Sequence, residues 1–211
     1  PSYTSEKTNS ESDGKKFADD VLSLLIIILL AIIFIVEIFT PYFVYLIAPG
    51  FYENSEKFEL AVDLVRITFP FLLFVSISSF FSGILNSFNK FAAAAAAPII
   101  LNIFLIISIL ISYLYNLNFA KYLSYGVTLA GITQLIFLIY FTFDFYSPKI
   151  SFSFKITSKV KFFFKKLLPS IFSSGVTQIN ILVGTIIASF QQGAVSYLYY
   201  ADRVYQINLA V

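Results

Sequence analysis

The sequence contains no cysteine, histidine, methionine or tryptophan. Without cysteine the chain can form no disulfide, no thiolate nucleophile and no zinc–sulfur site. Without histidine it has no imidazole base and no histidine metal ligand, so Ser-His-Asp and Cys-His catalysis are excluded within these 211 residues. The net charge of +2 is not gathered on one soluble face, which gives no reason to expect a nucleic-acid partner. We expect no metal, cofactor or catalytic residue.

Charged residues are also scarce, and apolar residues are correspondingly frequent. Only 12% of the residues are charged, which is about half the fraction in an average soluble domain. Apolar residues make up 58% of the chain, aromatic residues 19%, and the mean hydropathy is +0.84. These values predict an integral membrane protein. The chain begins at Pro1 and ends at Val211 inside an apolar stretch, so we expect it to be a piece of a longer protein.

Six apolar runs predict the membrane-spanning segments. They cover residues 18–47, 61–85, 92–115, 122–143 and 167–190, and a sixth begins near Ala194. The first five exceed the roughly 20 residues that a helix needs to cross the hydrocarbon core. Backbone groups in lipid must be paired within their own segment, so each run is expected to be a helix. The predicted fold is an all-α transmembrane bundle.

Lysines between the runs predict the orientation. One side receives residues 1–17, 86–91 and 144–166, with ten lysines, whereas the other side receives only Lys57 and Lys121. This bias places the first side in the cytoplasm. We expect residues 1–17 to be a flexible cytoplasmic connection, residues 18–143 to hold four transmembrane helices, and residues 167–211 to hold two more, the last truncated. Asp144 would lie at the cytoplasmic boundary.

The connection over residues 144–166 has its own pattern. Lys155, Lys159 and Lys166 are spaced by about one and two helical turns, and Phe162–Phe164 lie among them. The pattern is typical of a basic helix on the inner leaflet that leads into the next span at Pro169. Such a helix is most simply a positive-inside anchor, and specific contact with lipid headgroups is the alternative.

Arg203 lies about nine residues into the sixth run, near the middle of the membrane, where a charge is costly. Asp202 is its neighbour in sequence, but adjacent residues point about 100° apart on a helix, which disfavours a direct ion pair. A polar stripe at helical spacing contains Ser196, Tyr199, Arg203 and Gln206. Arginine suits phosphate because it forms bidentate hydrogen bonds. We expect a cavity-facing charge; pairing with an unseen helix is the alternative.

The fifth run has a polar face. Ser173, Thr177, Asn180 and Gly184 recur at spacings of three and four residues, with Gln178 beside them. Small and hydroxyl side chains also occur at dry helix–helix contacts, so close packing is one interpretation. Gln178 and Asn180 favour a wet or ligand-lined face.

Three stretches resemble the MurJ (MviN) lipid II flippases of the MOP exporter superfamily. The first contains Ala48-Pro-Gly-Phe51, Arg66-Ile-Thr-Phe-Pro70 and Gly83-Ile-Leu-Asn86, and the second is Ala97-Pro-Ile-Ile-Leu-Asn-Ile103. The third and most specific contains Gln178-Ile-Asn180, Ala188-Ser-Phe190 and Gly193-Ala-Val-Ser-Tyr-Leu-Tyr-Tyr-Ala-Asp-Arg203. Their order and spacing extend the resemblance over the whole chain.

The resemblance implies a fourteen-helix, two-lobe transporter of the bacterial cytoplasmic membrane, to which this chain contributes helices three to eight. Residues 144–166 would join the lobes. The implied activity is not enzymatic: lipid II, an undecaprenyl diphosphate carrying a disaccharide-pentapeptide, moves from the inner to the outer leaflet by alternating access. Membrane lipids and cell-wall synthesis proteins are the other expected partners. Arg203 matches a cavity arginine that the family uses for the diphosphate.

The expected substrate-binding residues are therefore Arg203, Gln178, Asn180, Ser196, Tyr199 and Gln206. Gly184 departs from relatives that carry Asp or Asn there, an acid linked to sodium binding, so the resemblance implies a drive by membrane potential instead. The alternatives are an exporter of another lipid-linked oligosaccharide such as O-antigen, a non-transporting scaffold for wall synthesis, and an intramembrane enzyme of envelope lipid synthesis.

Overall fold

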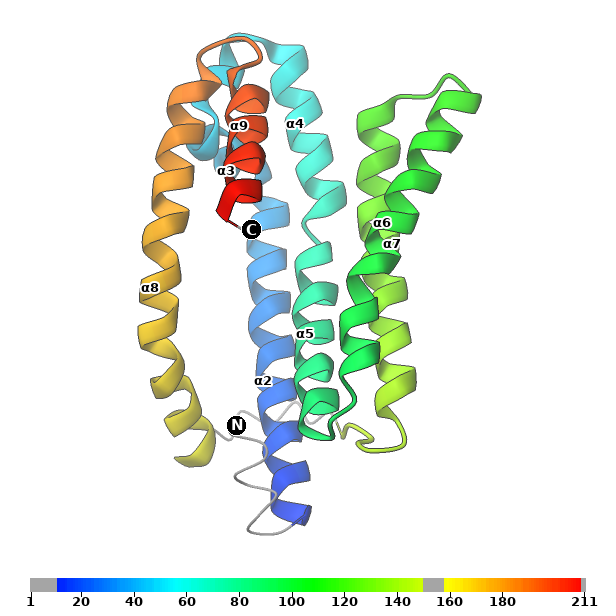
Figure 1. Ribbon diagram of the computed structural model, residues 1–211. Helices are drawn as coiled ribbons and strands as arrows, with labels where there is room; N and C mark the ends of the chain where they lie inside the picture. The colour runs from blue at the N-terminus through cyan, green and yellow to red at the C-terminus, as the bar shows by residue number, and fades with distance from the viewer. Residues whose placement is uncertain (1–10, 150–157, 210–211) are drawn as a thin grey trace. The chain divides into compact units, whose positions relative to one another are not determined.

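The computed structural model describes residues 11–149 and 158–209, and this part of the chain is helical throughout, with turns between the helices (Figure 1). The elements are α2 (Glu11–Ile38), α3 (Thr40–Ile47), the short 3₁₀ helix η1 (Pro49–Glu53), α4 (Ser55–Thr68), α5 (Phe71–Ser87), α6 (Phe91–Leu114), α7 (Phe119–Thr142), α8 (Ser158–Ser189) and α9 (Ala194–Leu209). The predicted all-α fold is confirmed.

Four helical segments within the described residues are long and apolar enough to cross a membrane. They are Gly14–Ile38, Ser55–Ser87, Phe91–Leu114 and Phe119–Thr142. A bent pair, Lys161–Ser170 and Ser174–Ser189, makes a fifth if it counts as one span. The sixth run corresponds to α9, whose 16 residues are fewer than the roughly 20 that a full crossing requires. The cytoplasmic assignment from the lysines stays a prediction.

The first span differs from its apolar run at both ends. Helix α2 begins at Glu11, so the prediction of a flexible connection over residues 1–17 is wrong for residues 11–17. The physical reason is tertiary packing: Phe17 is only 7% exposed, and its ring packs edge-on against Phe163 at 5.8 Å between centroids. At the other end, the run breaks at Phe39 because Pro41, near the start of α3, has no N–H to continue the helix.

Asparagine and glycine residues occupy the turns that end several helices. Asn89, Asn116 and Gly193 have positive φ angles of 59°, 51° and 76°. Asparagine and glycine adopt this left-handed conformation more readily than other residues do. Asn118 then begins α7, because its side-chain oxygen accepts a hydrogen bond of 3.1 Å from the backbone N–H of Lys121.

The chain forms two compact units, one with residues 1–37 and 66–165 and the other with residues 38–65 and 166–211. In the first unit, α7 packs against both α5 and α6. Its buried core includes Ala18, Leu22, Leu29, Ile77, Phe81, Ile84, Leu85, Ala97, Leu138 and Tyr146. The predicted division of the chain into lobes at residues 144–166 stays a prediction.

Both ends of the basic connection contact the beginning of α2. Asp19 Oδ1 accepts hydrogen bonds from the Tyr146 hydroxyl at 2.6 Å and from the Lys149 backbone N–H at 2.9 Å. At the other end, Phe163 and Phe164 pack against Phe17 and Val21, whereas Lys161 and Lys165 are exposed. This two-sided character fits the predicted interfacial helix, although Lys155 lies outside the described residues.

Glycine lets α7 approach its neighbours closely. A Cβ atom at Gly131 would lie 2.6 Å from a ring carbon of Phe71 and 3.1 Å from the Cβ of Phe74, both on α5. By contrast, a Cβ at Gly83 on α5 would meet no atom within 4 Å. The two glycines therefore provide a matched test of packing.

We predict that Gly131→Ala destabilises the complete protein by about 1–3 kcal/mol, because overpacking forces α5 and α7 apart. Gly83→Ala is expected to leave stability unchanged or raise it by up to about 1 kcal/mol, because alanine favours the helix. The measurement is thermal unfolding of the purified protein in detergent. Equal shifts for both variants would contradict the close α5–α7 packing.

Candidate functional site

Arg203 on α9 is held by side chains of its own helix. Its Nη1 atom donates a hydrogen bond of 2.9 Å to Oε1 of Gln206, three residues later. Its guanidinium carbon lies 4.9 Å from the ring centroid of Tyr199, one turn earlier. The face of an aromatic ring attracts a cation, so Tyr199 and Gln206 fix the guanidinium from both sides along the helix. All three side chains are exposed.

Asp202 joins this cluster through Gln206. The Gln206 Nε2 atom donates a hydrogen bond of 2.6 Å to Oδ2 of Asp202. Within the described residues, no ion pair joins Asp202 directly to Arg203, in agreement with the geometric expectation for adjacent residues on a helix. Guanidinium has five N–H donors, and one is used by Gln206. The remaining donors leave Arg203 able to bind an anion.

A pocket of about 460 Å³ lies beside the cluster, between α8 and α9. Its polar lining comes from Asn180 and Thr185 on α8 and from Tyr199 and Asp202 on α9. Apolar residues complete the wall: Ile181, Val183, Ile187, Val195 and Leu198. A mixed lining of this kind suits a ligand that has both polar and apolar parts.

Gly184 also lines this pocket and faces α9. A Cβ atom there would lie 3.3 Å from Cδ2 of Leu198, which is a tight contact. Glycine therefore keeps the two helices close, and it offers no side-chain ligand. Among the described residues there is no group of three or more acidic side chains placed to hold a metal ion.

The structure brings together four of the six predicted site residues. Tyr199, Arg203 and Gln206 form the cluster, and Asn180 shares the pocket with Tyr199. Gln178 is exposed and does not line the pocket. It lies two residues before Asn180, and two helical steps turn a side chain by roughly 200°. Ser196 is exposed one turn before Tyr199, on the same stripe but outside the pocket.

Asp202 is the site residue that the sequence interpretation missed. The sequence suggests Asp202 only as a direct partner of Arg203, and their adjacency on a helix disfavours that pairing. Its spacing of four residues from Gln206 is the signal that could have found it, because side chains four apart lie on the same face of a helix.

The end of α8 is fixed by the chain around η1. The backbone N–H of Gly50 donates a hydrogen bond of 3.0 Å to Oγ of Ser189, the last residue of α8. A Cβ at Gly50 would lie 2.5 Å from main-chain atoms of Ser189 and Phe190. The chain then reverses at Gly193 and enters α9 (Figure 1). The Gly50 contact thus positions the hairpin that carries the site.

Comparison with known proteins places this arrangement in one family. The sequence model described as "Lipid II flippase MurJ" matches residues 1–211. The chain belongs to this family. Proteins named "Probable lipid II flippase MurJ" from Rickettsia prowazekii (strain Madrid E), Rhizobium tropici and Rhizobium meliloti (strain 1021) are 40%, 38% and 37% identical to it over the whole chain. The chain spans 41%, 40% and 40% of their lengths.

The family match confirms the resemblance inferred from the sequence motifs. The chain is part of a multi-pass protein of the bacterial cytoplasmic membrane, and its family is one of transporters. The roles assigned to Arg203 and to the residues around it stay predictions.

We predict that Gly50→Ala loosens the junction between η1 and α8, because the main-chain atoms of Ser189 and Phe190 cannot yield as a flexible side chain would. Amide hydrogen exchange of the complete protein should then speed up in residues 50–53 and 186–190. Gly175→Ala is the matched control, since a Cβ at Gly175 meets nothing within 4 Å. Unchanged exchange in Gly50→Ala would contradict this role for the contact.

Proposed function

We propose that this chain supplies part of a flippase that moves lipid II from the inner to the outer leaflet, and that Arg203 binds the diphosphate of the lipid. The observation that carries the proposal is the guanidinium held between Tyr199 and Gln206 beside a mixed polar and apolar pocket. Membership of the MurJ family supports the choice of substrate.

The chemistry of the cluster fits a diphosphate. A phosphate oxygen pair can accept two parallel hydrogen bonds from a guanidinium, which a single ammonium cannot reproduce. Because Tyr199 and Gln206 already restrict the guanidinium, little side-chain entropy remains to be lost on binding. The carboxylate of Asp202 is linked to the guanidinium through Gln206. Its negative charge repels the anion and keeps it from binding too tightly for release.

The pocket between α8 and α9 could receive the part of the headgroup next to the diphosphate. Asn180 and Thr185 offer an amide and a hydroxyl for sugar hydroxyl groups, and Tyr199 offers an aromatic face. Gln178 and Ser196 would have to contact the substrate at other points along its length.

Transport by this means needs no covalent step. A hydrated cationic cavity lowers the cost of carrying a charged, sugar-bearing headgroup through the hydrocarbon, while the lipid tail stays in the bilayer. Alternation between two states then changes the side to which the cavity opens. Contact with cell-wall synthesis proteins stays a prediction from the resemblance.

We predict that Arg203→Ala lowers the exposure of lipid II at the outer leaflet about tenfold or more. Charge-assisted hydrogen bonds contribute about 1.5–3 kcal/mol, which is about ten- to hundredfold in binding. Arg203→Lys should retain an intermediate activity, because it keeps the charge but loses bidentate geometry. The measurement is lipid II exposure in cells whose own flippase can be switched off, with the complete protein expressed from a plasmid.

Tyr205→Ala is the control, since helical geometry points this exposed side chain away from Arg203. If wild type and Arg203→Ala restore exposure of lipid II equally, the assignment of Arg203 is wrong. The same result would exclude a non-transporting scaffold, because the protein would have restored transport. If neither restores exposure despite correct insertion, the substrate is another lipid-linked sugar and the proposal fails.

A further inference from the structure

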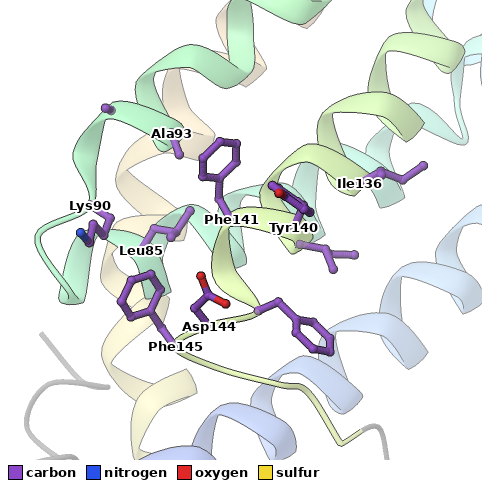
Figure 2. Close-up of a pocket in the computed structure, with 11 residues that line it drawn as sticks. Leu85, Lys90, Ala93, Ile136, Tyr140, Phe141, Asp144 and Phe145 are labelled. Atoms are coloured by element: carbon purple, nitrogen blue, oxygen red, sulfur yellow. The ribbon is translucent and has the colours of Figure 1, made fainter.

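A second pocket lies in the other compact unit and is lined by residues other than those assigned to lipid II. It has a volume of about 820 Å³ and is lined by the end of α5, the beginning of α6, the end of α7 and the residues that follow α7. Figure 2 shows Leu85, Ala93, Tyr140 and Asp144 around it, with Lys90 at its edge.

One end of this pocket lies at the membrane depth of lipid headgroups. The other end lies at the depth of the acyl chains. Lys90 immediately precedes the span Phe91–Leu114, and Asp144 follows the span Phe119–Thr142 by two residues. Both therefore lie at the end of their spans, on the side that the lysine count assigns to the cytoplasm. Ile136 lies six residues before the end of α7 at Thr142, about 9 Å deeper along the helix.

The lining of the pocket contains two side chains of opposite charge. Lys90 and Asp144 are both exposed, and the Lys90 Nζ atom lies 5.6 Å from the ring centroid of Phe145, which holds it beside the pocket. No ion pair between Lys90 and Asp144 is formed in the described part of the chain. Figure 2 shows the carboxylate of Asp144 directed toward the space between the labelled side chains. The pocket thus presents one cation and one anion to an incoming ligand.

The rest of the lining is apolar and leaves room for a chain. Ala92 and Ala93 on α6 have small side chains, which leaves space beside them in the pocket. Ile136 and Tyr140 form the wall on α7, and both are exposed. An acyl chain can lie along this wall. It would cover the apolar surface of the wall, which otherwise faces the polar headgroup region.

We propose that this pocket binds one membrane phospholipid whose headgroup carries both a phosphate and a primary ammonium, as phosphatidylethanolamine does. Lys90 pairs with the phosphate, Asp144 accepts hydrogen bonds from the ammonium, and one acyl chain lies along α6 and α7. Asp144 disfavours an anionic headgroup such as phosphatidylglycerol by repulsion. A quaternary ammonium, as in phosphatidylcholine, has no N–H to donate to Asp144. This binding goes beyond lipid II transport and involves a different set of residues.

The test is native mass spectrometry of the complete protein, released from bilayers that contain equal amounts of phosphatidylethanolamine, phosphatidylglycerol and phosphatidylcholine. Wild type is expected to retain phosphatidylethanolamine preferentially. Asp144→Asn should lower the ratio of retained phosphatidylethanolamine to phosphatidylglycerol about two- to fivefold, the effect of one partly exposed ion pair. Lys90→Gln should lower retention of both. Lys121→Gln, at the opposite end of α7, is the matched control and should change neither.

Ala92→Phe provides a second variant that leaves the charges in place. Its ring fills the pocket, so retention of all three phospholipids should fall. Phosphatidylethanolamine with a photoreactive acyl chain should label peptides that contain residues 85–93 or 136–145 in wild type, and much less in this variant.

Equal lipid ratios in wild type and Asp144→Asn would overturn the proposal. So would labelling that avoids both peptides, which is the outcome if another segment of the complete protein covers the pocket. Failure of the lipid II assignment would be distinguishable, because Arg203→Ala is expected to lose lipid II exposure and to keep this phospholipid retention unchanged.

Discussion

The structure depends on one constraint: in hydrocarbon, a polar group without a partner is costly, so the chain must satisfy its own hydrogen bonds. Most of the described polar groups meet it with helices and with short-range side-chain bonds, whereas Ser78, Ser112 and Gln134 each have a buried side-chain oxygen without a hydrogen-bond partner. Hydroxyl groups of Ser79, Ser124, Thr133, Thr142 and Thr185 donate to the carbonyl oxygen four residues earlier. Where a helix has to stop, Asn118 or Gly193 at the turn reduces the cost.

The same constraint explains how the charged groups are held. Asp19 is paired with the Tyr146 hydroxyl and the Lys149 N–H at a span boundary. Arg203 is surrounded by partners on its own helix, and Gln206 separates it from Asp202. A direct ion pair would have neutralised the cation, whereas the bridging amide fixes its position and leaves donors available. This arrangement is more typical of a cation that binds a ligand than of a cation that stabilises the fold.

Much of the fold could be predicted because it follows from local pattern. The lengths of the apolar runs predicted the spans, and helical spacing predicted the stripe of Tyr199, Arg203 and Gln206. What failed depends on contacts between distant residues. Helix α2 starts early because Phe17 meets Phe163, almost 150 residues later. No local pattern shows that contact.

The candidate site was predictable to the same extent. Spacing along α9 identified the cluster, but it could not show that α8 turns Asn180 and Gly184 toward α9. Gln178 was included for its chemistry although its helical phase opposes that of Asn180. Asp202 was missed because the sequence interpretation weighed only its adjacency to Arg203. Residue type suggested the chemistry, and only the packing of the two helices decided which side chains share a pocket.

The proposed function requires Arg203 to face water and substrate instead of lipid or a dry helix contact. Because this chain contains no cysteine, Arg203→Cys can be placed in the complete protein, with any cysteine elsewhere replaced, and treated with a charged, membrane-impermeant maleimide. Labelling is expected at this position. With Arg203 intact, Ser196→Cys on the same exposed stripe should be labelled more slowly when lipid II is added, whereas labelling of Tyr205→Cys should not change. If Arg203→Cys reacts only with lipid-soluble reagents, or if Ser196→Cys reacts at the same rate with and without lipid II, Arg203 does not face water and substrate.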